Sequence, residues 1–163
     1  MLNSSVAPDS VTARAYGKVN LHLGVGDARE DGYHELTTVF QAVDLYEDVT
    51  LTRESSQRGT LGLTVESMFG DDVPTDASNL AWRGVELVRE IAREHAARGA
   101  ELLSEPDVGL RIEIAKGVPV AGGMAGGSAD AAAAMTAAAE FFWPAQALPV
   151  AELRSRSVAL GAD

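Results

Sequence analysis

The chain has 163 residues, of which 46% are apolar and 23% charged, so it suits one compact domain and is not globally disordered. Its formal net charge of −11 argues against a nucleic acid or an anionic membrane as a partner, and the absence of cysteine excludes disulfides and thiolate zinc sites. No segment has the pattern of a secretion signal or the roughly 18 apolar residues of a membrane span, so we expect a cytoplasmic protein.

The N-terminal third is expected to be mostly antiparallel β-structure. Alternation over residues 11–25 places apolar side chains on one face of a strand and Lys18, Asn20 and His22 on the other. This strand is expected to break near Gly17. After a turn at Asp31 and Gly32, two further runs predict strands over residues 35–52 and 60–66.

The remainder of the chain alternates helical and extended patterns. Ser78 or Asn79 is a candidate N-cap for an amphipathic helix that stops at Gly99. The elements expected after it are a strand over residues 108–114, an alanine-rich helix from Ser128 that Pro144 ends, and a last helix over residues 148–160. With no internal repeat and no long linker, we expect a single α+β domain.

The segment PVAGGMAGGSADA, residues 119–131, has the composition of a phosphate-binding loop. A strand, a glycine-rich loop and a helix start in succession gather backbone N–H groups and the positive end of a helix dipole around one point. Ser128 could cap the helix or reach a phosphate oxygen or its metal ion. A Walker A loop is excluded because no lysine follows Gly127, and the spacing does not fit a dinucleotide fingerprint. The alternative is that the glycines only let a helix pack tightly on a sheet.

This segment resembles the phosphate loop of the GHMP kinases, a family of small-molecule kinases. Met124 and Ala125 replace the usual Gly-Leu pair, and Ala129 replaces a frequent second serine. The resemblance implies the two-layer α+β fold of the ribosomal protein S5 domain 2 type, with residues 1–163 as the N-terminal, ATP-binding domain. It also implies that a C-terminal domain of the same protein is missing from this chain. In the family, the segment that begins at Gly161 carries the catalytic aspartate.

Two further segments, GKVNLHL and EDGYHELTTVFQAVDLYEDV, resemble one branch of this family. That branch phosphorylates 4-diphosphocytidyl-2-C-methyl-D-erythritol in the non-mevalonate isoprenoid pathway, and related kinases of mevalonate or homoserine lack its D-G-Y-H segment as a rule. The resemblance therefore implies transfer of a phosphoryl group from ATP to the 2-hydroxyl of this small-molecule substrate. Two alternatives stay open: a GHMP kinase of the mevalonate or homoserine type, and a catalytically incomplete nucleotide-binding fragment.

The resemblance gives catalytic roles to Lys18 and Asp163. Lys18 would stabilise negative charge at the acceptor hydroxyl and the γ-phosphate. The alternative without a function is a lysine that faces solvent. Asp163 would be the general base or would orient the hydroxyl, and the alternative is a frayed terminal aspartate. Asp130 is a rival carboxylate in the first turn of the expected helix, where stabilisation by the helix dipole is enough to explain it.

For the substrate, the resemblance implies contacts from Asn20, Tyr33 and His34. The tyrosine ring can stack on the cytosine and the imidazole can hydrogen-bond its edge, although a packed hairpin turn is an equal alternative. Asn20 would support the substrate hydroxyl or Lys18. His95, like the strand histidine His22, is expected only to pack, because neither has a metal-ligand partner at useful spacing.

ATP and Mg²⁺ are the implied cofactors. Mg²⁺ would be bound mostly by phosphate oxygens and water, so no protein metal ligand is expected. An ordinary strand-end lysine and an ordinary helix cap are the alternatives for Lys116 and Asn79. The residues implied to hold the nucleotide are Pro119, Val120, Ala121, Gly122, Gly123, Met124, Ala125, Gly126, Gly127, Ser128, Ala129, Asn79, Leu80 and Lys116.

Overall fold

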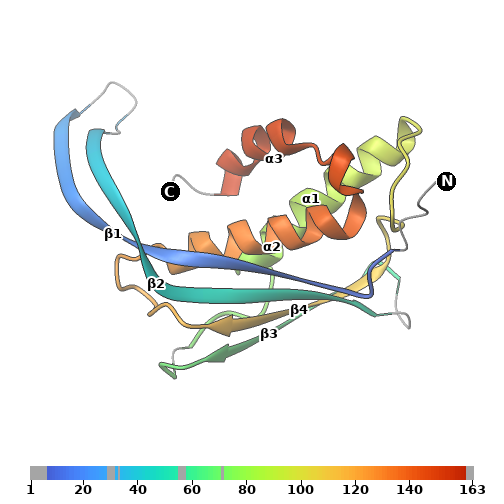
Figure 1. Cartoon of the computed structure of the whole chain (residues 1–163), viewed down its shortest axis with the longest axis horizontal. Coiled ribbons are helices and arrows are strands. Elements are labelled where there is room, and N and C mark those ends of the chain that lie inside the picture. The colour runs from blue at the N-terminus through green and yellow to red at the C-terminus, as the bar shows by residue number, and fades with distance from the viewer. Residues whose placement is uncertain (1–6, 29–31, 33, 55–57, 71, 161–163) are drawn as a thin grey trace.

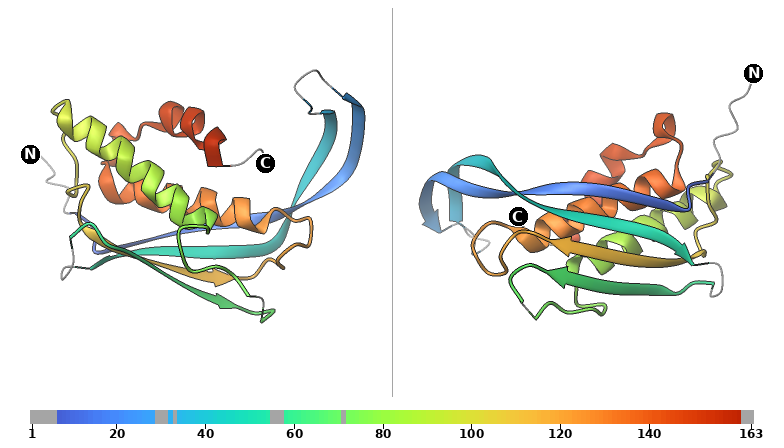
Figure 2. Two further views of the ribbon diagram at one scale, coloured as in Figure 1. Left: turned by 180° about the vertical axis from the view of Figure 1, so that it is seen from behind. Right: turned by 60° about the horizontal axis from the view of Figure 1, so that its bottom comes forward.

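The computed structural model describes residues 7–28, 32, 34–54, 58–70 and 72–160, and they form two layers (Figure 1). One layer is a mixed sheet with strand order β1-β2-β4-β3, and the other consists of helices that cover one face of it (Figure 2). The strands are β1 (Ser10–Ala28), β2 (His34–Glu54), β3 (Leu61–Ser67) and β4 (Gly109–Lys116). The expected two-layer α+β arrangement is therefore present.

The sheet combines a long antiparallel hairpin with one parallel pair. β1 and β2 pair antiparallel along most of their length, with a register shift between Tyr16 and Lys18. The expected break near Gly17 is thus an irregularity inside one continuous strand. β2 pairs antiparallel with β4, whereas β3 runs parallel to β4, because helix α1 (Leu80–Ala97) carries the chain back between them.

The helix ends agree with the sequence at α1 and differ from it at α2 (Gly126–Phe142). Asn79 is the N-cap of α1, and its Oδ1 accepts a hydrogen bond of 2.8 Å from the Ala81 amide. Helix α2 begins at Gly126, two residues before the expected Ser128. Of the two roles expected for Ser128, capping is therefore wrong, and a contact with phosphate or its metal ion stays a prediction. The N-cap of α2 is Ala125, which has left-handed backbone and makes no side-chain cap bond.

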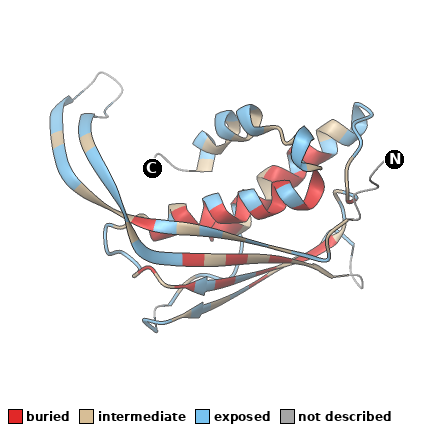
Figure 3. Ribbon diagram, in the orientation of Figure 1, coloured by how far each residue is buried: buried red, intermediate tan, exposed pale blue. Residues whose placement is uncertain are grey.

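The hydrophobic core lies between the sheet and the first two helices (Figure 3). Alternate residues of β2 and β4 point into it, and the many alanines of α2 let this helix approach both α1 and the sheet. Helix α3 (Val150–Ser157) lies outside α1 and α2, farther from the sheet (Figure 1). In the part of the chain that the structure describes, no helix is both long and apolar enough to cross a membrane. Fully buried core residues include Val49, Leu51, Val85, Val88, Ile91, Leu110, Ile112, Phe141 and Phe142.

The outer part of the β1–β2 hairpin projects beyond the helical layer (Figure 1). The apolar side chains that alternation places on one face of β1 are exposed there: Leu21 by 66%, Leu23 by 53% and Val25 by 60%. On the paired strand, Phe40 is 60% exposed. The alternation thus predicts the strand correctly, but no described element covers its apolar face.

Candidate functional site

The glycine-rich segment forms the wall of a cavity of about 530 Å³, a size typical of small-molecule sites. The segment connects the end of β4 to the start of α2. The first amides of this helix, and the positive end of its dipole, therefore lie at the cavity. The cavity is lined by Lys18, Asp72, Val73, Pro74, Ser78, Asn79, Leu80, Lys116, Pro119, Val120, Ala121, Gly122, Gly123, Met124, Ala125, Gly126, Gly127, Ser128 and Asp130. Most of the residues expected to hold a nucleotide are thus gathered around one space.

Left-handed backbone shapes the loop at three positions. Gly123 has a φ of 70°, and Ala121 and Ala125 each have a φ of 58°. An alanine in this region costs about 1–2 kcal/mol, so the surrounding structure must hold both alanines in place. A curved run of small residues that ends in a helix N-terminus presents N–H donors to an anion. The shape of the loop suits a phosphate group, and phosphate binding stays a prediction.

Strand β1 supplies a lysine to the rim of this loop. The Lys18 backbone amide donates to the Met124 carbonyl (3.2 Å), and its ammonium donates to the Gly123 carbonyl (3.0 Å) and to Asn20 Oδ1 (2.8 Å). Asn20 in turn donates to Thr38 Oγ1 (2.8 Å) across the hairpin. The ammonium is therefore fixed against the loop, and the alternative of a lysine that only faces solvent does not describe its contacts.

Beneath the loop lies a buried cluster of three charged side chains. Lys116 Nζ lies 2.5 Å from Glu47 Oε1 and 2.7 Å from Asp130 Oδ2. The three side chains are 3%, 0% and 4% exposed, respectively. Burial raises the pKa of the Glu47 carboxyl, while the neighbouring ammonium opposes this shift. Helix-dipole stabilisation is thus not the full account of Asp130, and Lys116 is not an ordinary strand-end lysine.

Sequence reasoning did not single out Glu47, although a signal was present. Glu47, Val49 and Leu51 alternate on β2, and all three side chains point into the same buried layer. A carboxylate in phase with two core residues is buried and needs a partner. The antiparallel register that places Glu47 opposite Lys116 identifies that partner.

The residues expected to bind the substrate are not brought together by the described part of the chain. Asn20 lies beside Lys18, whereas His34 pairs with Ala28 near the outer end of the hairpin and is exposed. The His34 ring nitrogen Nδ1 lies 2.8 Å from the Gly26 carbonyl. Tyr33 and the expected base Asp163 lie outside the described residues.

The other two histidines differ in their surroundings. His95 packs edge-on against Trp143 with 5.6 Å between ring centroids, as expected, and its Nε2 lies 2.8 Å from a Glu152 oxygen. His22 is exposed on the hairpin, so the expectation that it packs is wrong. Among the described residues, no group of three potential metal-binding side chains is present.

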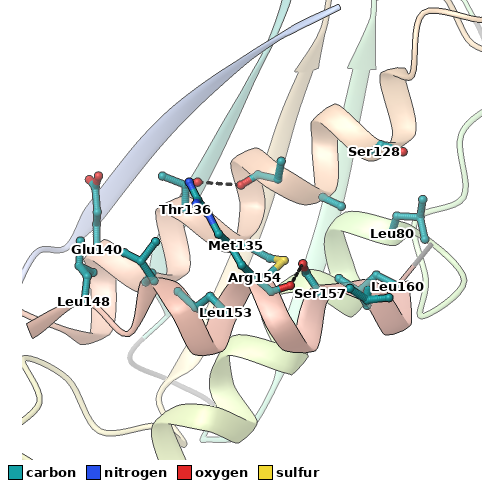
Figure 4. A pocket seen from close by; sticks show the side chains of 15 residues that line it. Leu80, Ser128, Met135, Thr136, Glu140, Leu148, Leu153, Arg154, Ser157 and Leu160 are labelled. Carbon is teal, nitrogen blue, oxygen red and sulfur yellow. Dashed lines mark hydrogen bonds between the residues drawn. The ribbon is translucent and has the colours of Figure 1, made fainter. Parts of the chain in front are cut away.

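A second cavity, of about 600 Å³, lies between α2 and α3 (Figure 4). Its walls are mostly apolar, with Met135 and Leu153 among them, and it was not anticipated from the sequence. Leu80 and Ser128 line both cavities and stand at one end of this one in Figure 4, so both spaces lie beside the start of α2.

Known proteins resemble this chain in sequence. A protein of Corynebacterium jeikeium named 4-diphosphocytidyl-2-C-methyl-D-erythritol kinase is 45% identical over 177 residues, which cover 94% of this chain and 48% of the relative. A protein of the same name from Corynebacterium efficiens is 53% identical over 139 residues, which cover 82% of this chain and 41% of the relative. The chain therefore spans about half the length of the curated relatives it matches.

Solved structures share its fold. A crystal structure of 4-(cytidine 5'-diphospho)-2C-methyl-D-erythritol kinase superposes with a TM-score of 0.62 at 33% identity, covering 93% of this chain and 46% of that one. A homoserine kinase from Cytophaga hutchinsonii superposes with a TM-score of 0.61 at 16% identity, covering 98% and 43%, and shows the fold alone. Residues 79–163 match the GHMP kinases N terminal domain. This match takes in more than half of the chain, which therefore belongs to the GHMP kinase family.

Proposed function

We propose that this chain is the ATP-binding half of a kinase that phosphorylates the 2-hydroxyl of 4-diphosphocytidyl-2-C-methyl-D-erythritol. The observation that carries the proposal is the position of Lys18, whose ammonium is held 3.0 Å from the Gly123 carbonyl at the rim of the phosphate loop. The names and the 45–53% identity of the curated relatives support this substrate over others. In this proposal the pathway is the non-mevalonate route to isoprenoids, and the location is the cytoplasm.

The loop and α2 would bind the triphosphate of ATP. Backbone N–H groups of residues 119–129 and the positive end of the α2 dipole would face the phosphate oxygens. Asn79, Leu80 and Lys116 line the same cavity and would flank the nucleoside end. Because the loop already holds its curved shape, little ordering would be needed when the nucleotide binds.

Lys18 and Asp163 would act on the reacting groups. The hydroxyl oxygen of the substrate attacks the γ-phosphorus, the bond from that phosphorus to the β,γ-bridging oxygen breaks, and ADP leaves. Lys18 would place its charge beside the developing negative charge, in an orientation fixed by its bond of 2.8 Å to Asn20. Asp163 would receive the hydroxyl proton. Asn20, Tyr33 and His34 are the proposed contacts for the cytidyl substrate.

Mg²⁺ is proposed to enter with ATP. The described residues offer no cage of carboxylates or imidazoles, and the Ser128 hydroxyl lines the phosphate cavity. In this proposal the ion would be held mainly by phosphate oxygens and water, with the Ser128 hydroxyl nearby. Such an ion neutralises charge on the phosphates.

A second domain, supplied by the other half of the relatives' length, is proposed to complete the protein. The apolar side chains Leu21, Leu23 and Val25 are exposed on the projecting hairpin. Contiguous exposed apolar surface of this kind usually marks an interface. The alternative of a catalytically incomplete nucleotide-binding fragment describes this chain if the second domain supplies part of the substrate pocket.

The test is ADP release from this chain and from a longer version that includes the C-terminal half found in its relatives. The separate acceptors are 4-diphosphocytidyl-2-C-methyl-D-erythritol, mevalonate and homoserine. We expect the longer protein to act only on the cytidyl substrate and Lys18→Ala to reduce its kcat by at least about 100-fold. Arg14→Ala, on the same strand and in an exposed ion pair, is the matched control.

Each result distinguishes the proposed kinase activity from an alternative. Turnover of mevalonate or homoserine alone would replace the substrate with that of another GHMP kinase. Undiminished turnover in Lys18→Ala would remove the lysine from the mechanism. Nucleotide binding without turnover in both lengths of chain would favour the non-catalytic alternative.

A further inference from the structure

The buried cluster of Glu47, Lys116 and Asp130 joins three elements at the two ends of the phosphate loop. Lys116 is the last residue of β4, where the loop begins, and Asp130 lies in the first turns of α2, where the loop ends. Glu47 approaches from β2, directly opposite Lys116 in the register. The Lys116 ammonium therefore bonds to carboxylates on β2 and α2 and links the start of the loop to its end.

The charged side chains of this cluster are unusual for buried positions whose only role is to pack the core. Two carboxylates face one ammonium in a space almost closed to solvent. Glu47 Oε2 and Asp130 Oδ1 are buried with no hydrogen-bond partner among the described residues. Apolar side chains of similar volume generally stabilise a buried position at least as well as ions do. Stability alone therefore does not account for these three residue types.

Contact with Gly126 connects the cluster to the loop. A Cβ added to Gly126 would lie 3.0 Å from Glu47 Oε1 and 3.3 Å from Lys116 Nζ. The first residue of α2 thus rests directly on the cluster, and only a glycine fits there without displacing it. The position of the helix start, and of the amides beside it, depends on where these two side chains lie.

We propose that Glu47, Lys116 and Asp130 are positioning residues that clamp the two ends of the phosphate loop and set its N–H groups before the nucleotide binds. The inference rests on the proposed function for the identity of the ligand, a nucleotide phosphate. The Lys116 ammonium acts through the loop, because two of its three N–H groups already donate to buried carboxylates. The residue also lines the cavity beside the proposed nucleoside position. Asp130 acts as the anchor of α2 in the same clamp.

The first test measures hydrogen exchange at two amides that bracket the loop, in the nucleotide-free chain. The Lys18 amide donates to the Met124 carbonyl, and the Ala129 amide donates to the Ala125 carbonyl. We expect Asp130→Ala to lower the protection of both amides by about 10-fold. Asp130→Asn keeps an acceptor for Lys116 and should lower it less. The Leu110 amide, which donates to Thr60 at the far end of β4, should be unaffected.

The control for this test is Asp48→Asn, which removes a carboxylate from the neighbouring position of β2 and from an exposed pair with Arg14. Protection at Lys18 and Ala129 should match that of the unmodified chain in this variant. Unchanged protection in both Asp130 variants would overturn the clamp. If Asp130→Ala does not fold, the Asn variant alone decides.

The second test is a compensation experiment on MgATP affinity. Gly126→Ala places a methyl group against Glu47 and should raise the Kd by about 10-fold, because the helix start is displaced. Glu47→Asp shortens that side chain by one methylene, so the double variant should regain a Kd within about threefold of Glu47→Asp alone. Gly62→Ala, where the nearest atom to the new methyl group is 3.9 Å away, is the matched control.

The outcomes separate the clamp from the proposed function. A double variant that binds no better than Gly126→Ala would overturn the coupling between the cluster and the loop. An unmodified chain that binds no MgATP would overturn the proposed nucleotide function, while the exchange measurement would still decide whether the clamp exists.

Discussion

The same two strands, β1 and β2, have opposite surroundings in the two halves of their length. Near the helices, Val49 and Leu51 are fully buried, whereas on the projecting hairpin Leu23 and Val25 are more than half exposed. Both halves pair antiparallel, but the pairs from Ser10 to Tyr16 keep one register, whereas three register shifts fall between Tyr16 and Ala28. The helical layer covers only the inner half, so an alternating pattern indicates a strand but does not show what lies on its apolar face.

Glu47 marks the boundary between these two regions. It belongs to the last pair that links β2 to β4, and beyond it toward the hairpin tip β2 pairs with β1 alone. The charged cluster therefore sits where the covered part of the sheet ends. Variants on either side of this boundary can test how sharply the two regions differ.

The largest expected effect is that of Lys116→Met at the boundary. This variant leaves two buried carboxylates without their counter-ion and should lower the free energy of unfolding by about 3–5 kcal/mol at neutral pH. Arg14→Met removes one partner of a pair whose side chains are 45% and 29% exposed, and should lower it far less, because solvent screens the pair. Urea unfolding followed by circular dichroism measures both, and equal losses would mean that the boundary cluster is not protected from solvent.

The next effect compares the same residue type in the two regions. Leu51→Ala in the core should lower the free energy of unfolding by about 2–5 kcal/mol, since it leaves a cavity. Leu23→Ala on the hairpin should change it by less than about 0.5 kcal/mol. The same urea titrations measure this pair. A large loss from Leu23→Ala would show that the hairpin face is covered in solution.

A third effect compares the pH dependence of neighbouring side chains on β2. The raised pKa of Glu47 favours the folded state below the ordinary value of 4.5, and that contribution is lost as pH rises through the folded pKa. The free energy of unfolding of Glu47→Gln, relative to that of the unmodified chain, should therefore increase as pH rises, by at most about 1.4 kcal/mol per pH unit.

Asp48 should behave in the opposite way. The hydrogen bond from Arg14 lowers its pKa, so its contribution is present above the ordinary value of 3.8 and is lost as pH falls through the folded pKa. The free energy of unfolding of Asp48→Asn should therefore be lower than that of the unmodified chain, most clearly at neutral pH. The difference should be small, because the pair is partly exposed. Unfolding titrations from about pH 3 to about pH 8 compare the sign of the pH dependence in the Glu47 and Asp48 variants. Equal signs would contradict the buried and exposed assignments.

The smallest expected effect on the stability of this chain concerns the exposed leucines of the hairpin. Leu21→Ser combined with Leu23→Ser should leave the free energy of unfolding of this chain within about 0.5 kcal/mol. In the longer protein, the same pair should cost about 1.5–3 kcal/mol for each leucine that the proposed second domain buries. Thermal unfolding of the two lengths of chain makes the comparison. Equal small losses in both would place the interface elsewhere.

Much of the fold and part of the site follow from local sequence. The cap at Asn79 and the end of α2 before Pro144 depend on neighbouring residues, so they could be predicted. The start of α2 could not, because nothing marks Ala125 as a residue that adopts left-handed backbone. The clamp was missed for a different reason: Glu47 and Lys116 meet through strand pairing, which local patterns do not specify.

The bonds that shape the loop also bear on when it can form. Lys116 and Glu47 are 69 residues apart, and the ammonium of Lys18 reaches a carbonyl 105 residues along the chain. Contacts of such long sequence separation generally form after local ones during folding, because more chain entropy is lost in closing them. Affinity for a phosphate ligand should therefore emerge only in the final phase of refolding, after most helical structure has formed.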